Sequence, residues 1–408
     1  MKGKFKKMRG RKQSTMHRVL DKVLMIVSII VTVCIIVALA LNAPIVSYTS
    51  IENGVKTTKD ISVISYYKNW KPLVNIEGTL QQKDQSAYDV AVETDSNGVD
   101  ETVSDDGLDL TQIIEGQYTI LFLGFDESGK LSDVDWVFQI DLKTQTMNVL
   151  QIPRDTFVPD FTSASTGKFN SVYQNGDSEV SPIQRVVNAV QDNFGFAIDA
   201  YVTLQCGDIV DIVDSIGGIP ITLPQRIVYE ADKILEAGPQ TLTGQQSEWF
   251  VRFRHGYDEG DIGRVQAQRI FMAAVFSKAF DMGTVETYKA LKTVYDNKWI
   301  ATNLSVDDIG KLCNLMSVLS MDNVSVYMVP GEGANYYPGD GSYQSVWSVH
   351  KRAVIDLLNS QFRPYQNPIV YEDNPLVELT QEGSYLNTKY DDQTATLKSI
   401  TDAASQMN

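Results

Sequence analysis

A run of 19 residues from Val23 to Leu41 carries no charge and is almost entirely apolar. As a helix rising about 1.5 Å per residue, it nearly crosses a hydrocarbon core of about 30 Å. Nine Lys or Arg lie within residues 1–22, and positive charge holds that end of a membrane helix in the cytoplasm. The sequence therefore predicts a basic cytoplasmic tail over 1–22, a single transmembrane helix over 23–42 and an extracytoplasmic remainder. A cleaved signal peptide is the alternative, because residues 38–40 (Ala-Leu-Ala) resemble a cleavage site, but the apolar core of such peptides usually has only about 7–15 residues.

The charge and cysteine content of the rest of the chain narrow the classes of function. Beyond residue 22 the chain has 26 basic and 50 acidic residues, and such a surface repels nucleic acid, so no nucleic-acid partner is expected. With three histidines in 408 residues, a His-rich zinc site is not favoured. The two cysteines outside the apolar run, Cys206 and Cys313, give no disulfide framework. Two buried thiols are favoured over one Cys206–Cys313 bridge.

The predicted domain organisation follows changes of composition along the chain. Residues 43–116 read as an extracytoplasmic stalk that contains an acidic linker, since residues 84–115 hold ten acids and no Lys or Arg. Strands alternating with helices predict a layered α-β-α domain of the α/β class with a central mixed sheet over 117–365. Residues 366–408 read as a polar, loosely attached C-terminal tail.

Several segments of the predicted domain have clear local signals. The apolar run YTILFLGFD, and then VDWVFQIDL and TMNVLQI, predict neighbouring strands. SPIQRVVNAVQDNFG predicts a helix, with a Ser cap, Pro in the first turn and a closing Gly. Residues 243–282 read as helical apart from the polar loop HGYDEGD, and SVWSVHKRAVIDLLNSQF, residues 345–362, reads as the last helix.

Four arginines stand within residues 251–269 of this acidic chain. In VRFR, an extended segment would point Arg252 and Arg254 to the same side, with the apolar residues packed behind them. Arg264 and Gln268 share one face of the helix predicted after them. A guanidinium is a planar, permanently charged fork that suits paired phosphate oxygens. The alternative is that these arginines pair with nearby acids such as Asp261 on a solvated surface.

A second group of charged residues follows the predicted strands. Arg154 comes directly after the strand TMNVLQI, and ligands of open α/β sheets bind at the carboxyl ends of strands. Asp126 ends one predicted strand and Asp133 begins the next, so both carboxylates are expected to hold one Mg²⁺ or Mn²⁺. Local turn capping is the alternative for either Asp alone. Lys168 is a further candidate phosphate contact, whereas no serine or cysteine nucleophile motif and no phosphate-binding glycine motif is present.

These segments, in this order, resemble the LytR-CpsA-Psr family. The resemblance is carried by ILFLGFD, SDVDWVFQIDLKT, LQIPRDTFV, KFNSVY, IDAYVTL with GGIPITLP, AGPQTLTGQQSEWFVRFR and GDIGRVQAQR. It implies a membrane-anchored extracytoplasmic phosphotransferase that moves a glycopolymer, such as wall teichoic acid or capsule, from a polyprenyl-pyrophosphate carrier to peptidoglycan. The alternative is a non-catalytic scaffold or regulator that binds polyprenyl-phosphate lipid or cell-wall polymer.

The resemblance also implies roles for individual residues. It assigns catalysis to Arg154, Arg252, Arg254 and Asp133. It assigns substrate binding to Arg264, Gln268, Lys168 and Arg269, the last standing in for an arginine that Ala267 replaces. It assigns the metal to Asp133 and Asp126. Val134 departs from the Thr that is common after the aspartate of the SD motif.

Overall fold

The structure, a computed structural model, describes residues 44–52, 55–62, 117–141, 143–177, 179–254, 256–258, 260–315, 318–339, 342–364, 366–379 and 392–406. The chain divides into two compact units, residues 1–70 and 71–408. The described part of the first unit is one antiparallel hairpin, β1 (Pro44–Glu52) with β2 (Val55–Ser62). The predicted basic tail, transmembrane helix and acidic linker lie outside the described residues. None of the helices in the described part has the length and apolar content needed to span a bilayer.

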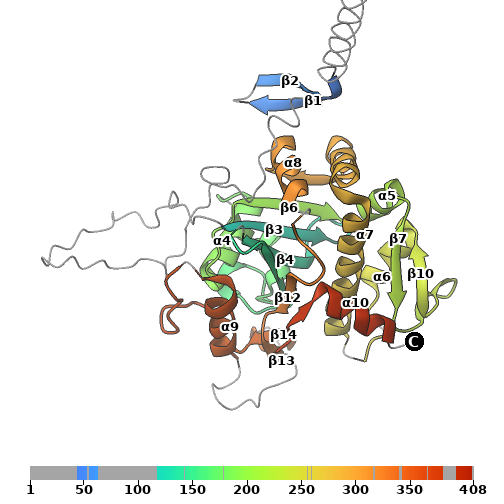
Figure 1. Cartoon of the computed structure of the whole chain (residues 1–408). Coiled ribbons are helices and arrows are strands. Elements are labelled where there is room, and N and C mark those ends of the chain that lie inside the picture. The colour runs from blue at the N-terminus through green and yellow to red at the C-terminus, as the bar shows by residue number, and fades with distance from the viewer. Residues whose placement is uncertain are drawn as a thin grey trace, which may run out of the picture. The chain divides into compact units, whose positions relative to one another are not determined.

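The second unit is built around one mixed sheet (Figure 1). Among the described residues, its seven strands lie in the order β11-β6-β3-β4-β5-β12-β15, with β3 parallel to β6, β5 parallel to β12 and the other pairs antiparallel. Their bounds are β3 (Gln117–Phe125), β4 (Ser132–Asp141), β5 (Thr146–Ile152), β6 (Ala200–Gln205), β11 (Ile300–Thr302), β12 (Val324–Met328) and β15 (Ala395–Thr396). The predicted central mixed sheet is therefore confirmed.

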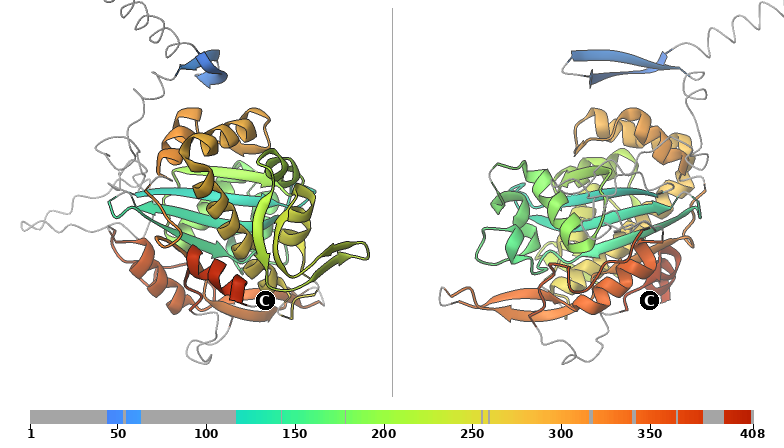
Figure 2. Two further views of the ribbon diagram at one scale, coloured as in Figure 1. Left: turned by 45° about the vertical axis from the view of Figure 1, so that its right-hand side comes forward. Right: turned by 90° about the vertical axis from the view of Figure 1, so that its left-hand side faces the viewer.

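Helices cover both faces of this sheet (Figure 2). On one face are α4 (Pro182–Phe194) and α9 (Lys351–Leu357), which is continued by a turn of π-helix, η4 (Leu358–Phe362). On the other are α5 (Asp208–Ser215), α7 (Asp261–Asp296) and α8 (Val306–Leu315), with α6 (Gly244–Arg252) packed on α5 and α7. The layered α-β-α arrangement follows from β3, whose Leu121 and Leu123 join the core under α4 while Ile120 and Phe122 face α5 and α7.

Shorter elements complete the unit. After β5 come η2 (Pro159–Phe161), then η3 (Phe169–Ser171), which contacts β4, and α3 (Val172–Asn175), which packs on α4. In the part of this unit that the structure describes, three antiparallel pairs stand outside the main sheet, namely β7 (Ile219–Leu223) with β10 (Gly238–Leu242), β8 (Ile227–Glu230) with β9 (Lys233–Leu235), and β13 (Gly331–Tyr336) with β14 (Gln344–Val349). The last helix of the described residues is α10 (Leu397–Gln406).

The local signals of α4 are confirmed at both ends. The Ser181 hydroxyl accepts a hydrogen bond from the backbone N–H of Gln184, and Pro182 occupies the first helical position. Gly195 closes the helix with a φ of 68°, a left-handed conformation that favours glycine.

The helix predicted over 345–362 is wrong in its first third. Residues Gln344–Val349 form β14, which pairs with β13 along its whole length, and the helix starts only at Lys351. The apolar residues of SVWSV fit a strand period as well as a helical one, and the partner strand decides between them.

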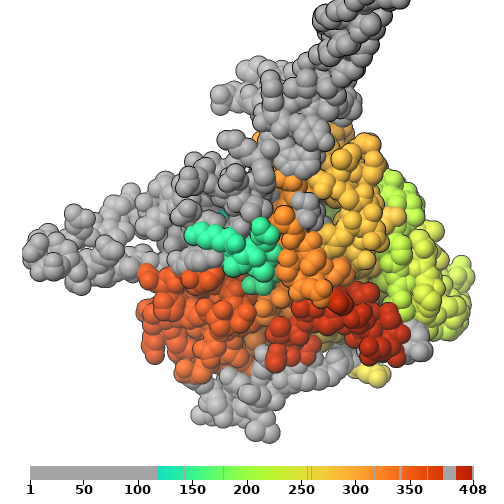
Figure 3. Space-filling model, viewed as in Figure 1, coloured from blue at the N-terminus to red at the C-terminus, as the bar shows by residue number. Residues whose placement is uncertain are grey.

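The predicted loose tail over 366–408 is also wrong for the residues that the structure describes. Ile369 and Leu376 are buried in the core on the α4 side, and β15 adds an edge strand to the main sheet. After it, α10 packs on α7 and β7, where Figure 3 shows the red C-terminal segment lying against the body of the domain. A few apolar side chains at the right spacing anchor a segment whose average composition is polar.

Candidate active site

Arg154, Arg264 and Asp133 lie together at one end of strands β4 and β5 in the main sheet. Asp133 stands at an irregularity where Gly124 pairs with Val134 and Phe125 with Ser132, so Asp133 has no partner across the strands and its side chain is re-aimed. Its Oδ1 lies 2.7 Å from Nη1 of Arg154 and 3.3 Å from Nη1 of Arg264. The sequence prediction that Arg154 and Arg264 share one site with Asp133 is thus matched by their geometry.

A second carboxylate, Asp261, joins the same two arginines. It is the first residue of α7, and its Oδ1 lies 2.9 Å from Nη2 of Arg264 and 3.3 Å from Nε of Arg154. Burial alone would lower the pKa of Arg154, but Asp261, Asp133 and Asp155 outweigh it and raise the pKa above its ordinary value. The Arg154 guanidinium is therefore held charged, and the two carboxylates hold both guanidiniums in position. The sequence interpretation treated Asp261 only as a possible surface partner, and its place one turn before Arg264 was the available signal.

Lys168 extends the cluster on the side of the loop after β5. Its Nζ lies 3.1 Å from Oδ1 of Asp155, whose carboxylate also lies 3.7 Å from Nε of Arg154. The loop is fixed because the hydroxyl and the N–H of Thr156 both donate to the carbonyl of Pro153. Three cations and three carboxylates therefore alternate at this end of the strands.

Asp135 is a further acid beside the cluster that sequence reasoning missed. Its side chain is buried on β4, two residues after Asp133. Burial raises the pKa of Asp135 to about 7, against the opposing effect of the Ser132 hydroxyl, and nearby Asp133 raises it further. No sequence motif marks this residue. An Asp within an apolar strand is normally expected on an exposed face, and only the structure shows that both faces of this strand are covered.

Arg252 and Arg254 do not share an extended segment, because the helix predicted from residue 243 includes Arg252. Arg252 is the last residue of α6, where Phe253 ends the helix. Its Nη1 lies 2.7 Å from Oε1 of Glu127 and 2.9 Å from Oε1 of Glu248. For Arg254 the described part of the chain shows no ion pair.

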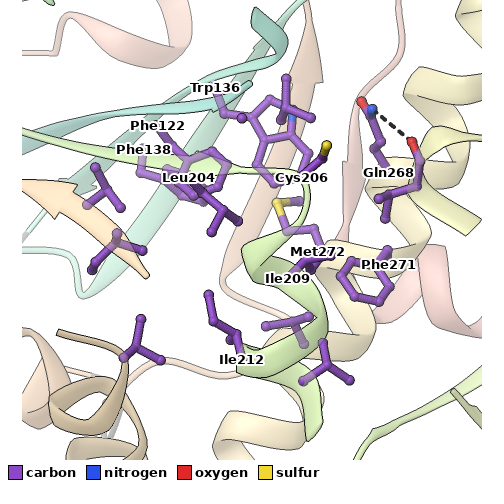
Figure 4. A pocket seen from close by; sticks show the side chains of 18 of the residues that line it. Phe122, Trp136, Phe138, Leu204, Cys206, Ile209, Ile212, Gln268, Phe271 and Met272 are labelled. Carbon is purple, nitrogen blue, oxygen red and sulfur yellow. Dashed lines mark hydrogen bonds between the residues drawn. The ribbon is translucent and has the colours of Figure 1, made fainter. Parts of the chain in front are cut away.

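A cavity of about 420 Å³ opens between the sheet and helices α5, α7 and α8 (Figure 4). Of its lining residues within the described part of the chain, only Asp133 and Arg252 are charged. Apolar side chains make up most of the rest, including Phe122, Trp136, Phe138, Leu204, Ile209, Ile212, Phe271 and Met272. Arg252 thus belongs to the same site as Asp133, at the cavity rather than in the Arg154 cluster.

Gln268 and Arg269 are neighbours on α7 with different surroundings. Gln268 lines the cavity and donates from Nε2 to the carbonyl of Val251 at 3.3 Å, as the dashed line in Figure 4 marks. Arg269 is buried elsewhere, with Nε donating to Gln151 Oε1 and Nη1 to the carbonyl of Gln393, both at 2.8 Å. Burial lowers the pKa of Arg269 to about 10. Its guanidinium joins α7 to β5 and the C-terminal segment, and its substrate-binding role stays a prediction.

Asp126 has the local capping role that the sequence left open. Its carboxylate accepts hydrogen bonds from the hydroxyl of Ser128 and from the backbone N–H of Lys130 and Leu131. Although burial raises it, the pKa of Asp126 lies below its ordinary value because of these bonds. Within the described ranges, no three His, Cys, Asp or Glu side chains are grouped to hold a metal ion.

Cys206 and Cys313 are both free thiols, as expected, but only Cys313 is buried and Cys206 is partly exposed. Burial raises the pKa of Cys313 to about 12, so this thiol is unreactive in the folded chain. Cys206 lines the cavity near Arg252, and burial raises its pKa despite that guanidinium.

The candidate site thus combines an apolar cavity with a neighbouring cluster of arginines and carboxylates in an α/β domain. The LytR_cpsA_psr family model matches residues 74–361, and the chain belongs to this family. It is 28% identical to the polyisoprenyl-teichoic acid–peptidoglycan teichoic acid transferase TagU of Bacillus mycoides over 239 residues, which are 56% of this chain and 76% of that protein. It is 27% identical to biofilm regulatory protein A of Streptococcus mutans over 256 residues, 57% of this chain and 61% of that protein.

The fold is shared with a solved structure. The crystal structure of TagV from Bacillus subtilis matches with a TM-score of 0.50 at 21% identity, covering 60% of this chain and 96% of that one. This similarity shows the mixed α/β fold with its central sheet.

Proposed function

We propose that the protein is a membrane-anchored extracytoplasmic phosphotransferase. It moves a glycopolymer, such as wall teichoic acid or capsule, from a polyprenyl-pyrophosphate carrier to peptidoglycan and leaves a phosphodiester. The names of the TagU relatives, teichoic acid transferases that act between a polyisoprenyl-linked polymer and peptidoglycan, support this class of reaction. The predicted transmembrane helix would place the domain beside the lipid carrier.

One observation carries the proposal. Among the described residues that line the apolar cavity, the charged ones are Asp133 and Arg252, and Asp133 also contacts Arg154 of the arginine cluster. A polyprenyl chain suits the apolar lining, and its pyrophosphate suits guanidiniums that cannot lose their charge. Arg252 contacts phosphate oxygens from the α6 side of the cavity, and Arg154 and Arg264 do so from the end of β4 and β5. Arg254 and Lys168 are further contacts along the polymer side of the pyrophosphate.

The reaction exchanges one phosphorus–oxygen bond for another. A sugar hydroxyl of peptidoglycan attacks the phosphorus that bears the glycopolymer, the bond to the bridging oxygen breaks, and polyprenyl phosphate leaves. The arginines stabilise the charge that develops on the phosphoryl oxygens, which is the main catalytic device in phosphoryl transfer. Both ion pairs of Asp133 engage Oδ1, so Oδ2 is the atom that would accept the hydroxyl proton.

A divalent cation, Mg²⁺ or Mn²⁺, belongs to this proposal with Asp133 as its protein ligand. The donors available at the cluster are carboxylate oxygens, which suit a hard cation, and magnesium needs only one or two of them beside water and phosphate. When bound, the cation would neutralise part of the pyrophosphate charge. The local hydrogen bonds of Asp126 leave it as a weaker candidate ligand.

The test is a transfer assay with the purified chain in detergent, a polyprenyl-pyrophosphate glycan and a peptidoglycan oligomer, with and without magnesium. Asp133→Asn and Arg154→Ala should abolish the phosphodiester product, and the exposed Arg226→Ala should not. Arg226 is a matched control because its ion pair with Glu236 is exposed and neither residue lines the cavity. If Asp133→Asn transfers at the normal rate, the proposed catalytic role of Asp133 is wrong. If the unsubstituted chain binds the donor lipid without any transfer, the non-catalytic scaffold is favoured. Product released to water instead of peptidoglycan would identify a hydrolase.

A further inference from the structure

Two tyrosines are exposed at the end of the β13–β14 hairpin and take no part in the site described above. Tyr337 is 51% exposed and Tyr343 is 73% exposed. Their ring centroids lie 5.2 Å apart with the ring planes tilted by 43°. Large aromatic side chains exposed in contact with each other are unusual on a soluble surface and mark a place where something docks.

The pairing of the hairpin shows which other residues share the tyrosine face. Partners across an antiparallel pair lie on one face, and so do alternate residues along a strand. Asn335 pairs with Ser345, and the Tyr337–Tyr343 contact lies two positions farther along, beyond the last pair of the ladder. Gly333 is exposed on the same face, and nothing would contact a side chain there. Trp347, the partner of Gly333, also lies on this face but is buried against Val265 and Met328. The exposed residues among those described on this face are therefore two aromatic rings, one amide, one hydroxyl and one glycine, with no charge.

The opposite face of the hairpin and the outer backbone edge of β14 join it to the candidate active site. The ring of Tyr336 packs on Phe157 with centroids 4.5 Å apart. The N–H of Trp347 donates to the carbonyl of Asp155 at 2.8 Å, and the N–H of Phe157 donates to the carbonyl of Trp347 at 3.0 Å. Phe157 in turn forms a bridge with Lys168. The hairpin is thus continuous with the loop that holds Arg154 and Lys168, and Figure 2 shows the orange hairpin extending from the body of the domain.

We infer that the tyrosine face of the β13–β14 hairpin binds the acceptor, the N-acetylated glycan strand of peptidoglycan. The inference rests on the proposed function, which requires an acceptor glycan beside the phosphate site. The C–H faces of sugar rings stack on aromatic rings, while Asn335 and Ser345 offer hydrogen bonds to hydroxyl and acetamido groups. A phosphate-rich polymer would instead require cations, and the described residues of this face have none.

The experiment measures binding, without any donor, of the full chain in detergent to peptidoglycan sacculi stripped of teichoic acid. The variant Tyr337→Ala/Tyr343→Ala should bind about tenfold more weakly, since two aromatic contacts are lost. Tyr337→Phe/Tyr343→Phe should retain binding if stacking dominates. The control is Val285→Ser, which removes an equally exposed apolar side chain, 51%, from α7 and should change nothing. Thermal melting confirms that each variant is folded.

A second arm uses soluble β-1,4-linked N-acetylglucosamine oligomers as competitors and a purified wall teichoic acid as the other polymer. The oligomers should displace the unsubstituted chain from sacculi, and teichoic acid binding should not depend on the tyrosines. Sacculus binding that is unchanged in the double alanine variant would overturn the inference, as would a loss confined to teichoic acid. Because no transfer is required, tyrosine-dependent binding by a chain that fails the transfer assay would refute the proposed function alone.

Discussion

Arg264 should stabilise the domain far more than a surface arginine does. Its side chain is only 4% exposed and contacts both Asp261 and Asp133, at 2.9 Å and 3.3 Å. Removing one partner of a buried ion pair costs about 3–5 kcal/mol, because the other charge is left uncompensated. Here both carboxylates keep Arg154 as a partner and are 23% and 26% exposed, so water shares the remaining charge. We therefore expect Arg264→Met to lower the free energy of unfolding by about 2–3 kcal/mol.

Urea unfolding at neutral pH, followed by tryptophan fluorescence, measures this difference against a matched variant. Arg226→Met removes the same group from an ion pair whose side chains are 50% and 71% exposed, and should cost less than about 0.5 kcal/mol. Adding Asp261→Asn to Arg264→Met should recover part of the loss, since it removes a carboxylate that lost a partner. If Arg264→Met and Arg226→Met unfold at the same urea concentration, the buried cluster does not stabilise the fold as argued.

Three further results are expected. Because burial raises the pKa of Asp135 to about 7, the folded chain keeps a proton that the unfolded chain releases above about pH 4. In metal-free buffer the free energy of unfolding should therefore fall as pH rises from about 4 to 7. Asp135→Asn should flatten this slope in urea titrations. Arg269→Met should lower the free energy of unfolding by about 1–3 kcal/mol, since Gln151 loses its partner, and leave transfer per folded molecule unchanged; a transfer defect without destabilisation would contradict this. Maleimide labelling of Cys206, followed by mass spectrometry, should slow when polyprenyl phosphate fills the cavity, while Cys313 stays unlabelled in the folded chain; equal rates for Cys206 with and without lipid would place the lipid elsewhere.

Elements with strong local signals could be predicted from the sequence. β3 contains a continuous apolar run and β4 and β5 are rich in apolar residues, because both faces of the sheet are covered. The start and stop residues of α4 flank it in the sequence. The elements that failed depend on distant partners. β14 is a strand because β13 lies beside it, and β15 has only two residues, whose pairing with β12 cannot be read locally.

The arginines of the site could be predicted from the sequence better than its carboxylates. Arg154 and Arg264 lie next to recognisable ends of elements, so their convergence follows from the topology of the sheet. The environments of the Asp135 and Arg269 side chains depend on burial, which the alternation and spacing of residues in the sequence do not reveal. Arg269 shows this most clearly. It follows Gln268 directly on α7, but Gln268 lines the cavity whereas the side chain of Arg269 points to Gln151 of β5.

The pairing of each cluster arginine with carboxylates has a consequence for how a phosphate would bind. Arg154 and Arg264 share both Asp133 and Asp261, so the described cluster has little excess positive charge for a pyrophosphate. Substrate oxygens must therefore replace carboxylate oxygens on guanidiniums that are already in place. That exchange costs little reorganisation, because the forks are held by the protein before the substrate arrives. It also leaves freed carboxylates beside new phosphate charge, and a divalent cation bound between them would remove that repulsion. On this argument magnesium should strengthen donor binding in the unsubstituted chain more than in Asp133→Asn, and an equal effect in both would show that the exchange occurs without a cation at Asp133.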